Sequence, residues 1–160
     1  MQLCKVPESV LVVVYTLALD VLLIERADHP GFWQSVTGSK ATLDEPLPMV
    51  CVREIAEETG LGVATEQLED WKITHRFAIY EQWRHRYAEG VTHNTEHVFG
   101  LCLPQPFEPR LNPLEHTQYQ WLPWRAAANA CFSWTNAEAI RRLENLQTNG
   151  DTQPDRDRVS

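Results

Sequence analysis

The sequence predicts an α/β fold in which one mixed β-sheet is sandwiched between α-helices. Strand-like and helix-like segments follow one another in the order strands, helix, strands, helix, which is the pattern of a sheet with helices packed on it. The 160 residues are the usual length of one compact domain, and no internal repeat or linker interrupts the interior. We therefore expect a single domain over residues 1–148.

Apolar and β-branched runs predict the strands. Residues 10–15 (Val-Leu-Val-Val-Val-Tyr) form a continuous apolar run, which is typical of a central strand buried on both faces. Residues 21–25 are expected to form its hairpin neighbour. The remaining segments are a short one at residues 32–37, strands at 72–83, 98–103 and 119–122, and a loop at 88–94 with turn residues Gly90 and Asn94.

Capping residues predict the first helix. It is expected to span Pro46–Thr59, because proline is tolerated in the first turn, where its missing amide has no partner. Asp44 or Glu45 is the expected N-cap. Gly60 is expected to end the helix in the left-handed conformation.

A second helix is predicted near the end of the chain. Thr135-Asn-Ala-Glu138 matches a capping box, so the helix is expected to run from Asn136 to about Leu146. Residues 149–160 are polar and lack apolar anchors, which predicts a disordered tail.

The composition narrows the classes of partner. The formal net charge of −8 disfavours binding to nucleic-acid polymers and to anionic membranes, since like charges repel. A small polyphosphate remains compatible, because divalent cations bridge acidic side chains to phosphates. The longest apolar run is too short to span a bilayer, and no basic segment precedes it as in a signal peptide. The four cysteines lie far apart, which together with the missing signal favours a reducing cytoplasm.

The first predicted helix separates apolar from acidic side chains. At 100° per residue, an apolar group clusters on one side, which we expect to face the core, and three glutamates cluster on nearly the opposite side. The apolar group consists of Met49, Val52, Ile55 and Ala56.

The three glutamates, Glu54, Glu57 and Glu58, repel one another unless something neutralises them. Arg53 is placed to pair with Glu57 at i,i+4, whereas Glu54 and Glu58 have no basic partner at helical spacing. A solvated acidic face and a site for a hard divalent cation both explain such a cluster, and from the pattern alone the solvated face is the commoner. A cation would reverse the sign of the repulsion and polarise a phosphoryl oxygen.

A family resemblance favours the metal site. Arg53-Glu-Ile-Ala-Glu-Glu-Thr-Gly-Leu61, preceded at the right distance by Glu45, resembles the Nudix box in residue type and spacing. One departure is that six residues, and not five, separate Gly38 from Glu45. The simplest explanation is a one-residue insertion within residues 39–44, before the helix.

The resemblance implies a Nudix fold and a hydrolase of phosphorus anhydrides that depends on Mg²⁺ or Mn²⁺. Carried over to this sequence, Glu54 and Glu58 become the principal metal ligands, and Glu57 becomes a further ligand or a group next to the ligands. Arg53 becomes the residue that orients them. Glu115 takes the position of the family's remote glutamate, which completes the metal site or acts as base.

Segments outside the box resemble one branch of this family, the dihydroneopterin triphosphate pyrophosphohydrolases of bacterial folate synthesis. These segments are Phe32–Ser39, Arg84–Thr92, Asn94–Glu96, Glu115–His116 followed by Tyr119–Leu122, and Ser133–Trp134 with Asn136. The resemblance implies cleavage of a pterin triphosphate to the monophosphate and pyrophosphate, with dATP and related nucleotides as further substrates.

The same resemblance assigns the substrate-binding residues. They are two basic residues, two polar residues, a strand edge with an aromatic wall, and a tryptophan: Lys5, Arg26, Thr37, Ser133, Phe77, Ala78, Ile79, Tyr80 and Trp33. Structural alternatives exist, since an exposed arginine is usually only surface and a tryptophan is usually core. The basic cluster at residues 84–86 is left out of the set, because exposed basic loop residues often have no special role.

Two alternative functions stay open at this point. One is a nucleotide-pool sanitising enzyme that hydrolyses (d)NTPs. The other is a catalytically silent Nudix-fold nucleotide-binding module, against which the intact set of glutamates argues. The sequence does not predict an oligomeric state.

Overall fold

The computed structural model describes residues 4–147, and the predicted tail at residues 149–160 lies outside them. The strands are β1 Glu8–Thr16, β2 Asp20–Arg26, β3 Trp33–Gln34, β4 Val36–Ser39, β5 Leu68–Ala78, β6 His93–Leu103 and β7 His116–Pro123. The helices are α1 Leu47–Thr59, α2 Trp124–Ala130 and α3 Trp134–Arg141, with two 3-10 helices, η1 Thr65–Gln67 and η2 Glu81–Arg86.

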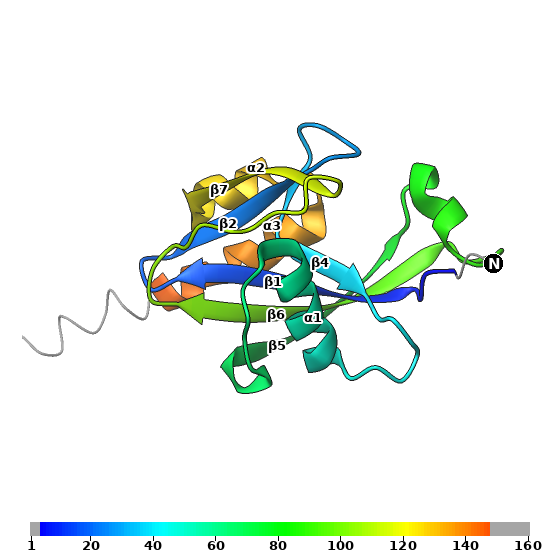
Figure 1. The fold of residues 1–160 in the computed structure, drawn as a ribbon, viewed down its shortest axis with the longest axis horizontal. Coiled ribbons are helices and arrows are strands. Elements are labelled where there is room, and N and C mark those ends of the chain that lie inside the picture. The colour runs from blue at the N-terminus through cyan, green and yellow to red at the C-terminus, as the bar shows by residue number, and fades with distance from the viewer. Residues whose placement is uncertain (1–3, 148–160) are drawn as a thin grey trace, which may run out of the picture.

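Within the described residues, all seven strands belong to one mixed sheet (Figure 1). Its order is β3-β2-β1-β6-β5, with β4 pairing β1 and β7 pairing β2. The helix α1 packs on one face, and α2 and α3 pack on the other. The predicted α/β class and the layered arrangement are therefore confirmed.

The central strand β1 connects the two hydrophobic cores. It pairs in parallel with β6 and antiparallel with β2 and β4. Because side chains alternate along a strand, Val10 and Val12 join the core under α1, whereas Leu11 and Val13 join the core under α2 and α3. The continuous apolar run is thus buried on both faces, as predicted.

Only the C-terminal end of α1 matches the prediction. Gly60 ends the helix with a φ of 77°, the left-handed stop that was expected. At the other end the predicted cap by Asp44 or Glu45 is wrong, because Pro46 is the N-cap residue and no side chain caps the helix. The carboxylate of Glu45 is instead engaged by the side chain of Arg53.

The predicted orientation of α1 is also wrong in part. Met49 is 49% exposed, whereas Glu54 and Glu58 are only 9% and 4% exposed. Val50 and Ile55 face the core. The reason is tertiary: β4 lies beside the helix and covers the flank that carries the two glutamates, so those carboxylates are buried between helix and sheet.

Two predicted boundaries in the middle of the chain differ from the structure. The strand expected at residues 72–83 begins earlier and ends at Ala78, after which the chain enters η2. Ala78 pairs with His93, the first residue of β6, and one further backbone hydrogen bond, from the amide of Ile79 to the oxygen of Thr92 at 2.9 Å, precedes η2. Asn94, expected to be a turn residue, lies within β6 and pairs with Phe77.

The C-terminal helices also differ in detail. Ser133 caps α3 by accepting a hydrogen bond from the backbone amide of Asn136, so the helix begins two residues before the predicted start. The capping box at Thr135 is therefore wrong. The helix α2 was not predicted, because no side chain caps its first turn and its N-cap is Pro123.

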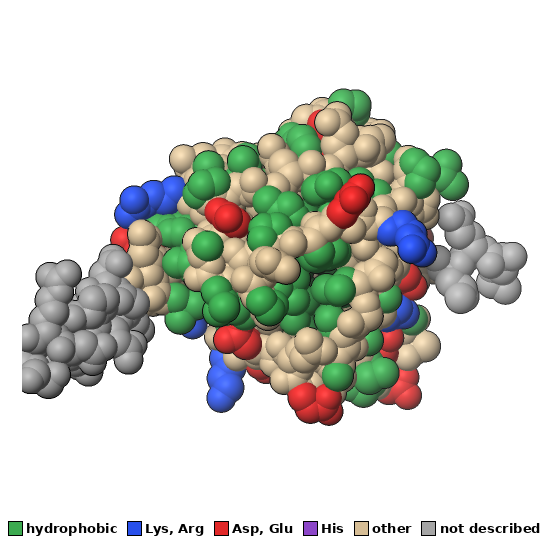
Figure 2. Space-filling model, turned by 60° about the vertical axis from the view of Figure 1, so that its left-hand side comes forward, with side chains coloured by type: hydrophobic (Ala, Val, Ile, Leu, Met, Phe, Trp, Pro, Cys, Tyr) green, Lys and Arg blue, Asp and Glu red, His purple; other side chains and the backbone are tan. Residues whose placement is uncertain are grey.

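No helix within residues 4–147 is long and apolar enough to cross a membrane. Figure 2 shows one face of the molecule, on which hydrophobic side chains gather toward the middle and acidic side chains lie around them, several of them at the lower right. The basic side chains in this view lie toward its edges. A continuous basic surface, as a nucleic-acid polymer would need, is not present on this face.

Candidate active site

A cavity of about 810 Å³ opens beside the buried carboxylates of α1. It collects nearly all of the predicted site residues: Lys5, Arg26, Thr37, Glu54, Glu57, Glu58, Phe77, Ala78, Ile79, Tyr80, Glu115 and Ser133. Two predicted residues are not part of its lining. Arg53 lies behind the carboxylates, and Trp33 packs against the core under α2 and α3. The indole of Trp33 therefore has the structural role that is usual for a tryptophan.

Arg53 holds three groups in place at the back of the site. Its guanidinium donates to both carboxylate oxygens of Glu45, at 3.1 and 2.9 Å, and to the backbone oxygen of Ser39 at 2.9 Å. It also donates to Glu54 Oε1 at 2.7 Å. The predicted i,i+4 partner, Glu57, lies farther away, at 3.7 Å. Glu54 thus has a basic partner that helical spacing did not reveal.

The extra residue before the helix leaves this arrangement intact. Gly38 packs so closely on Glu54 that an added Cβ would lie 2.0 Å from the carboxylate carbon. Glu45, at the other end of the insertion, is bound by Arg53. The loop between these two residues absorbs the added length, because both of its ends are fixed to the same helix.

Glu54 and Glu58 form a buried carboxylate pair. Burial raises the pKa of Glu58 well above its ordinary value, and the negative charge of Glu54 raises it further. Burial also raises the pKa of Glu54, against the opposing effect of Arg53. Two acidic groups that are costly to ionise side by side are stabilised by any cation that binds between them.

His116, which sequence reasoning missed, does not supply that cation. Its Nε2 lies 4.0 Å from Glu58 Oε1 and 3.4 Å from Gln34 Nε2. Burial, together with the positive charge of Arg26, lowers the pKa of His116 to about 4. The imidazole is therefore neutral at physiological pH and adds no positive charge beside Glu58.

The chemistry of these groups fits a hard divalent cation. Carboxylate oxygens are the ligands that Mg²⁺ prefers, and the pair has no charged histidine to compete with it. Among residues 4–147, no three acidic, histidine or cysteine side chains converge around one point. The candidate metal site therefore consists of the Glu54–Glu58 pair. Glu115 is exposed and lies elsewhere on the cavity wall. It is close enough that its negative charge raises the pKa of Glu58.

Three basic side chains line the same part of the cavity: Lys5, Arg26 and Arg86. Arg26 donates twice to Asp28, at 2.8 Å each, and its guanidinium stacks over the ring of Trp83 at 4.4 Å. Desolvation, followed by the positive charges of Arg86 and Arg26, lowers the pKa of Lys5. Crowded cations of this kind are stabilised by a polyanion. We call these three residues with Glu54 and Glu58 the charged end of the cavity.

Arg86 belongs to the basic cluster that the sequence analysis left out. The 3-10 helix η2 carries it back over the cavity, where the backbone oxygen of Arg86 accepts a hydrogen bond from the amide of Lys5 at 2.8 Å. Tyr87, the next residue, forms an isolated bridge with Lys5. No sequence signal distinguished Arg86 from its neighbours, because the contact depends on how η2 folds back.

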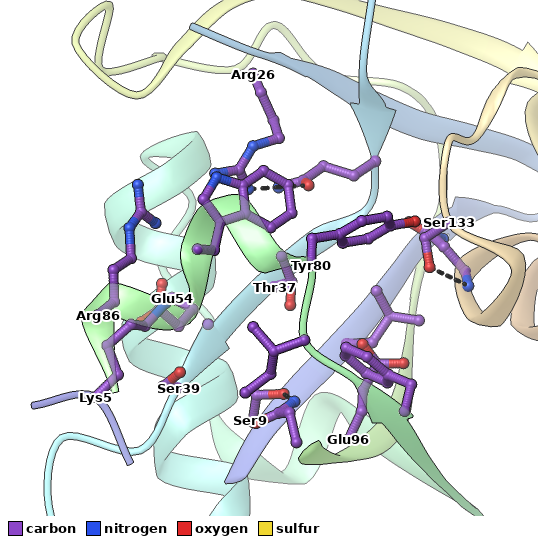
Figure 3. Close-up of a pocket in the computed structure, with 18 of the residues that line it drawn as sticks. Lys5, Ser9, Arg26, Thr37, Ser39, Glu54, Tyr80, Arg86, Glu96 and Ser133 are labelled. Atoms are coloured by element: carbon purple, nitrogen blue, oxygen red, sulfur yellow. Dashed lines mark hydrogen bonds between the residues drawn. The ribbon is translucent and has the colours of Figure 1, made fainter. Parts of the chain in front are cut away.

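The rest of the cavity lining is aromatic and polar, and the aromatic part adjoins Arg26. Tyr80, Trp83 and Phe132 pack around one another, with ring centroids 5.3 to 6.2 Å apart, and form one wall. Ser9, Asn94 and Glu96 form a polar floor, which sequence reasoning also missed as a site. Figure 3 shows Lys5, Arg86 and Glu54 on one side of the cavity and Ser9, Glu96 and Ser133 on the other.

The fold and the carboxylate helix define a protein class. The NUDIX domain model matches residues 5–143, and this chain belongs to the NUDIX family. It is 45% identical over 142 residues to the dihydroneopterin triphosphate diphosphatase of Escherichia coli (strain K12), which covers 87% of this chain and 93% of that protein. It is 38% identical over 144 residues to the diphosphatase of the same name from Haemophilus influenzae, which covers 88% of this chain and 89% of that protein.

Solved structures agree with this assignment. The structure of the E. coli dihydroneopterin triphosphate pyrophosphohydrolase matches with a TM-score of 0.81 and 43% identity, over 88% of this chain and 97% of that one. The MutT protein from Methanosarcina mazei matches with a TM-score of 0.66 and 19% identity, over 88% of this chain and 94% of that one, and so shares the fold alone. The predicted Nudix fold is confirmed.

Proposed function

We propose that this protein hydrolyses dihydroneopterin triphosphate to dihydroneopterin monophosphate and pyrophosphate. One observation carries the proposal: a buried pair of glutamates on the Nudix helix shares a single cavity with a group of basic side chains (Lys5, Arg26 and Arg86) and an aromatic wall. The relatives at 45% and 38% identity, which bear the name of this activity, support the choice of substrate.

Glu54 and Glu58 would hold the cation, Mg²⁺ or Mn²⁺, and Glu57 and Glu115 are further candidate ligands on the same cavity. When bound, such a cation neutralises phosphate charge and lowers the pKa of water. Arg53 is a positioning residue, because it fixes the carboxylate of Glu54 at 2.7 Å without lining the cavity.

The basic side chains would bind the triphosphate. Lys5, Arg26 and Arg86 offer charge-assisted hydrogen bonds to phosphate oxygens, and the bidentate contact with Asp28 holds the guanidinium of Arg26 in one orientation. A glutamate of the charged end, or Glu115, would accept the proton of the attacking water.

The ring of the substrate would lie in the aromatic part of the cavity. Phe77, Ala78, Ile79 and Tyr80 supply a strand edge and an apolar surface there, and Ser133 and Thr37 supply hydroxyl groups. Thr37 Oγ1 already donates to the backbone oxygen of Val10 at 3.0 Å, so its lone pairs remain available to a ligand.

We further propose that the reaction serves folate biosynthesis in the cytoplasm. The four cysteines are all free thiols, which is compatible with a reducing compartment.

The test is pyrophosphate release from dihydroneopterin triphosphate and from a panel of (d)NTPs, measured in parallel with Mg²⁺. We expect kcat/KM to be highest for the pterin triphosphate. A higher kcat/KM for dATP or an oxidised nucleotide would favour a nucleotide-pool sanitising enzyme. Absence of release from every triphosphate would favour a silent binding module.

A further inference from the structure

The polar floor contains buried acceptors without donors. Glu96 is 5% exposed and Asn94 is 4% exposed, and both line the cavity. Glu96 Oε1 and Asn94 Oδ1 have no hydrogen-bond partner among the described residues. The amide group of Asn94 is already used, since it donates to Ser9 Oγ at 2.7 Å. Unpartnered buried acceptors are costly, so a donor on a ligand in the adjoining cavity would stabilise this corner of the site.

The strand geometry places these acceptors side by side. Asn94 and Glu96 are two residues apart on β6, so their side chains project from the same face of the sheet. Glu96 pairs in register with Ser9 on β1 and with His75 on β5. The floor is therefore built on paired strands of the central sheet, β1 and β6, with β5 beside them.

A structural ion pair with His75 is the competing explanation for Glu96. His75 Nδ1 lies 3.7 Å from Glu96 Oε1, too far for a hydrogen bond, and the proximity of Glu96 raises the pKa of His75. The other ring nitrogen faces the exposed Glu138, with Nε2 to Oε2 at 3.6 Å. An ion pair with His75 accounts for the charge of Glu96 but leaves Asn94 Oδ1 without a donor.

A ring with two adjacent N–H donors would satisfy the floor. A 2-amino-4-oxopyrimidine edge has this pattern, since its ring N–H and its exocyclic amine point the same way. Guanine shares that edge, whereas adenine offers one amine next to a ring nitrogen acceptor. An acceptor facing a carboxylate is repelled, so the floor discriminates between these two kinds of ring.

We propose that Glu96, supported by Asn94, is the residue that selects the ring of the substrate by accepting hydrogen bonds from a 2-amino-4-oxopyrimidine edge. This inference rests on the triphosphate hydrolysis proposed above and assigns ring recognition to residues separate from the charged end.

The experiment compares wild type with Glu96→Gln, which keeps the shape of the side chain and removes its charge. Glu138→Gln is the matched control, because it removes the other carboxylate near His75 and lies outside the cavity. For each protein, kcat/KM is measured with dihydroneopterin triphosphate, dATP, dGTP and dITP. Circular dichroism and Tm report on folding.

We expect Glu96→Gln to lower the ratio of kcat/KM for the pterin triphosphate to that for dATP by about 10- to 100-fold, the range for losing a hydrogen bond to a charged group. The ratio does not depend on the fraction of folded enzyme. Glu138→Gln should keep the wild-type ratio. In wild type, kcat/KM for dGTP should be about tenfold higher than kcat/KM for dITP, because dITP lacks the 2-amino group.

Each outcome decides the matter. An unchanged ratio in Glu96→Gln, or equal kcat/KM for dGTP and dITP in wild type, would overturn the inference and leave the proposed function in place. A similar change of ratio in Glu138→Gln would assign the effect to the ion pairs of His75 and also overturn it. Absence of hydrolysis by wild type would overturn the proposed function, and the inference with it.

Discussion

The two ends of the cavity are built in different ways. The charged end depends on one helix, α1, whose glutamates and arginine are close in sequence, and on three basic residues brought in from β2, η2 and the segment before β1. The polar floor depends on the pairing of β1, β5 and β6, which brings together residues that are up to 87 positions apart, as with Ser9 and Glu96.

We expect the two ends to have different roles, with hydrolysis at the charged end and choice of the substrate ring at the polar floor. At the charged end, acidic groups are buried in a pair that a bound cation would stabilise, so substitutions there should affect every triphosphate alike. At the floor, the neutral acceptor of Asn94 and the acidic acceptor of Glu96 lack partners and would bind the substrate ring, so substitutions there should change substrate preference. The following predictions test the separation, from the largest expected effect to the smallest.

Glu58→Gln should lower kcat by more than about 100-fold for every substrate, since even a group that only supports a metal ligand is worth about 10- to 100-fold. The buried position accepts an uncharged amide of the same shape, so the Tm should be maintained or raised. Pyrophosphate release across a magnesium titration measures kcat, and thermal denaturation measures the Tm. Near-normal kcat at saturating magnesium would remove Glu58 from the catalytic set.

Two glycine substitutions give a matched pair. In Gly38→Ala the new Cβ would meet the Glu54 carboxylate at 2.0 Å, so activity should fall by about 10- to 100-fold and more magnesium should be needed. In Gly100→Ala the new Cβ would lie 2.5 Å from the Trp71 ring, away from the cavity, so the free energy of unfolding should fall by about 1–3 kcal/mol.

Denaturation curves and magnesium titrations of both glycine variants check this contrast. Gly100→Ala should keep the magnesium requirement of wild type. If instead Gly38→Ala loses only stability, the close contact with Glu54 has no bearing on the metal site.

Arg86→Gln should raise KM by about tenfold for all triphosphates, because one charge-assisted hydrogen bond to phosphate is lost. Arg125→Gln is the matched control for loss of one positive charge, because Arg125 stacks on Trp124 and lies outside the cavity lining. Steady-state kinetics at fixed ionic strength compare the two variants. Equal effects of both substitutions would attribute the change to overall charge.

Alkylation of Cys4 should have the smallest effect. Cys4 is exposed and lines the cavity next to Lys5, whereas burial raises the pKa of both Cys51 and Cys131 to about 12. Iodoacetamide at pH 8 should therefore modify Cys4 first, since the thiolate is the reactive form. The modified protein should show a modest rise in KM with unchanged ring preference, measured by mass spectrometry and kinetics.

The sequence predicted the charged end better than the floor for a physical reason. The Nudix glutamates and Arg53 lie on one helix, so their spacing is visible in the sequence, and Gly60 ends that helix where expected. The burial of Glu54 and Glu58 was not visible, because it depends on β4 covering one flank of α1.

The residues that sequence reasoning missed depend on long-range pairing. Asn94 was expected in a turn, and its role follows only from its register with Phe77. Arg86 reaches the cavity because η2 folds back after the end of β5 and bonds to Lys5. Trp33 was expected at the substrate, but it does not line the cavity; it pairs with Glu25 of β2 and packs, partly buried, against the core under α2 and α3.

One measurement tests the separation of the two ends most directly: kcat/KM for dihydroneopterin triphosphate and for dATP in wild type, Glu58→Gln and Glu96→Gln. We predict that Glu58→Gln lowers both values by the same factor. Glu96→Gln should instead lower the ratio of the pterin value to the dATP value by about 10- to 100-fold. The same pattern of change in both variants would contradict the account.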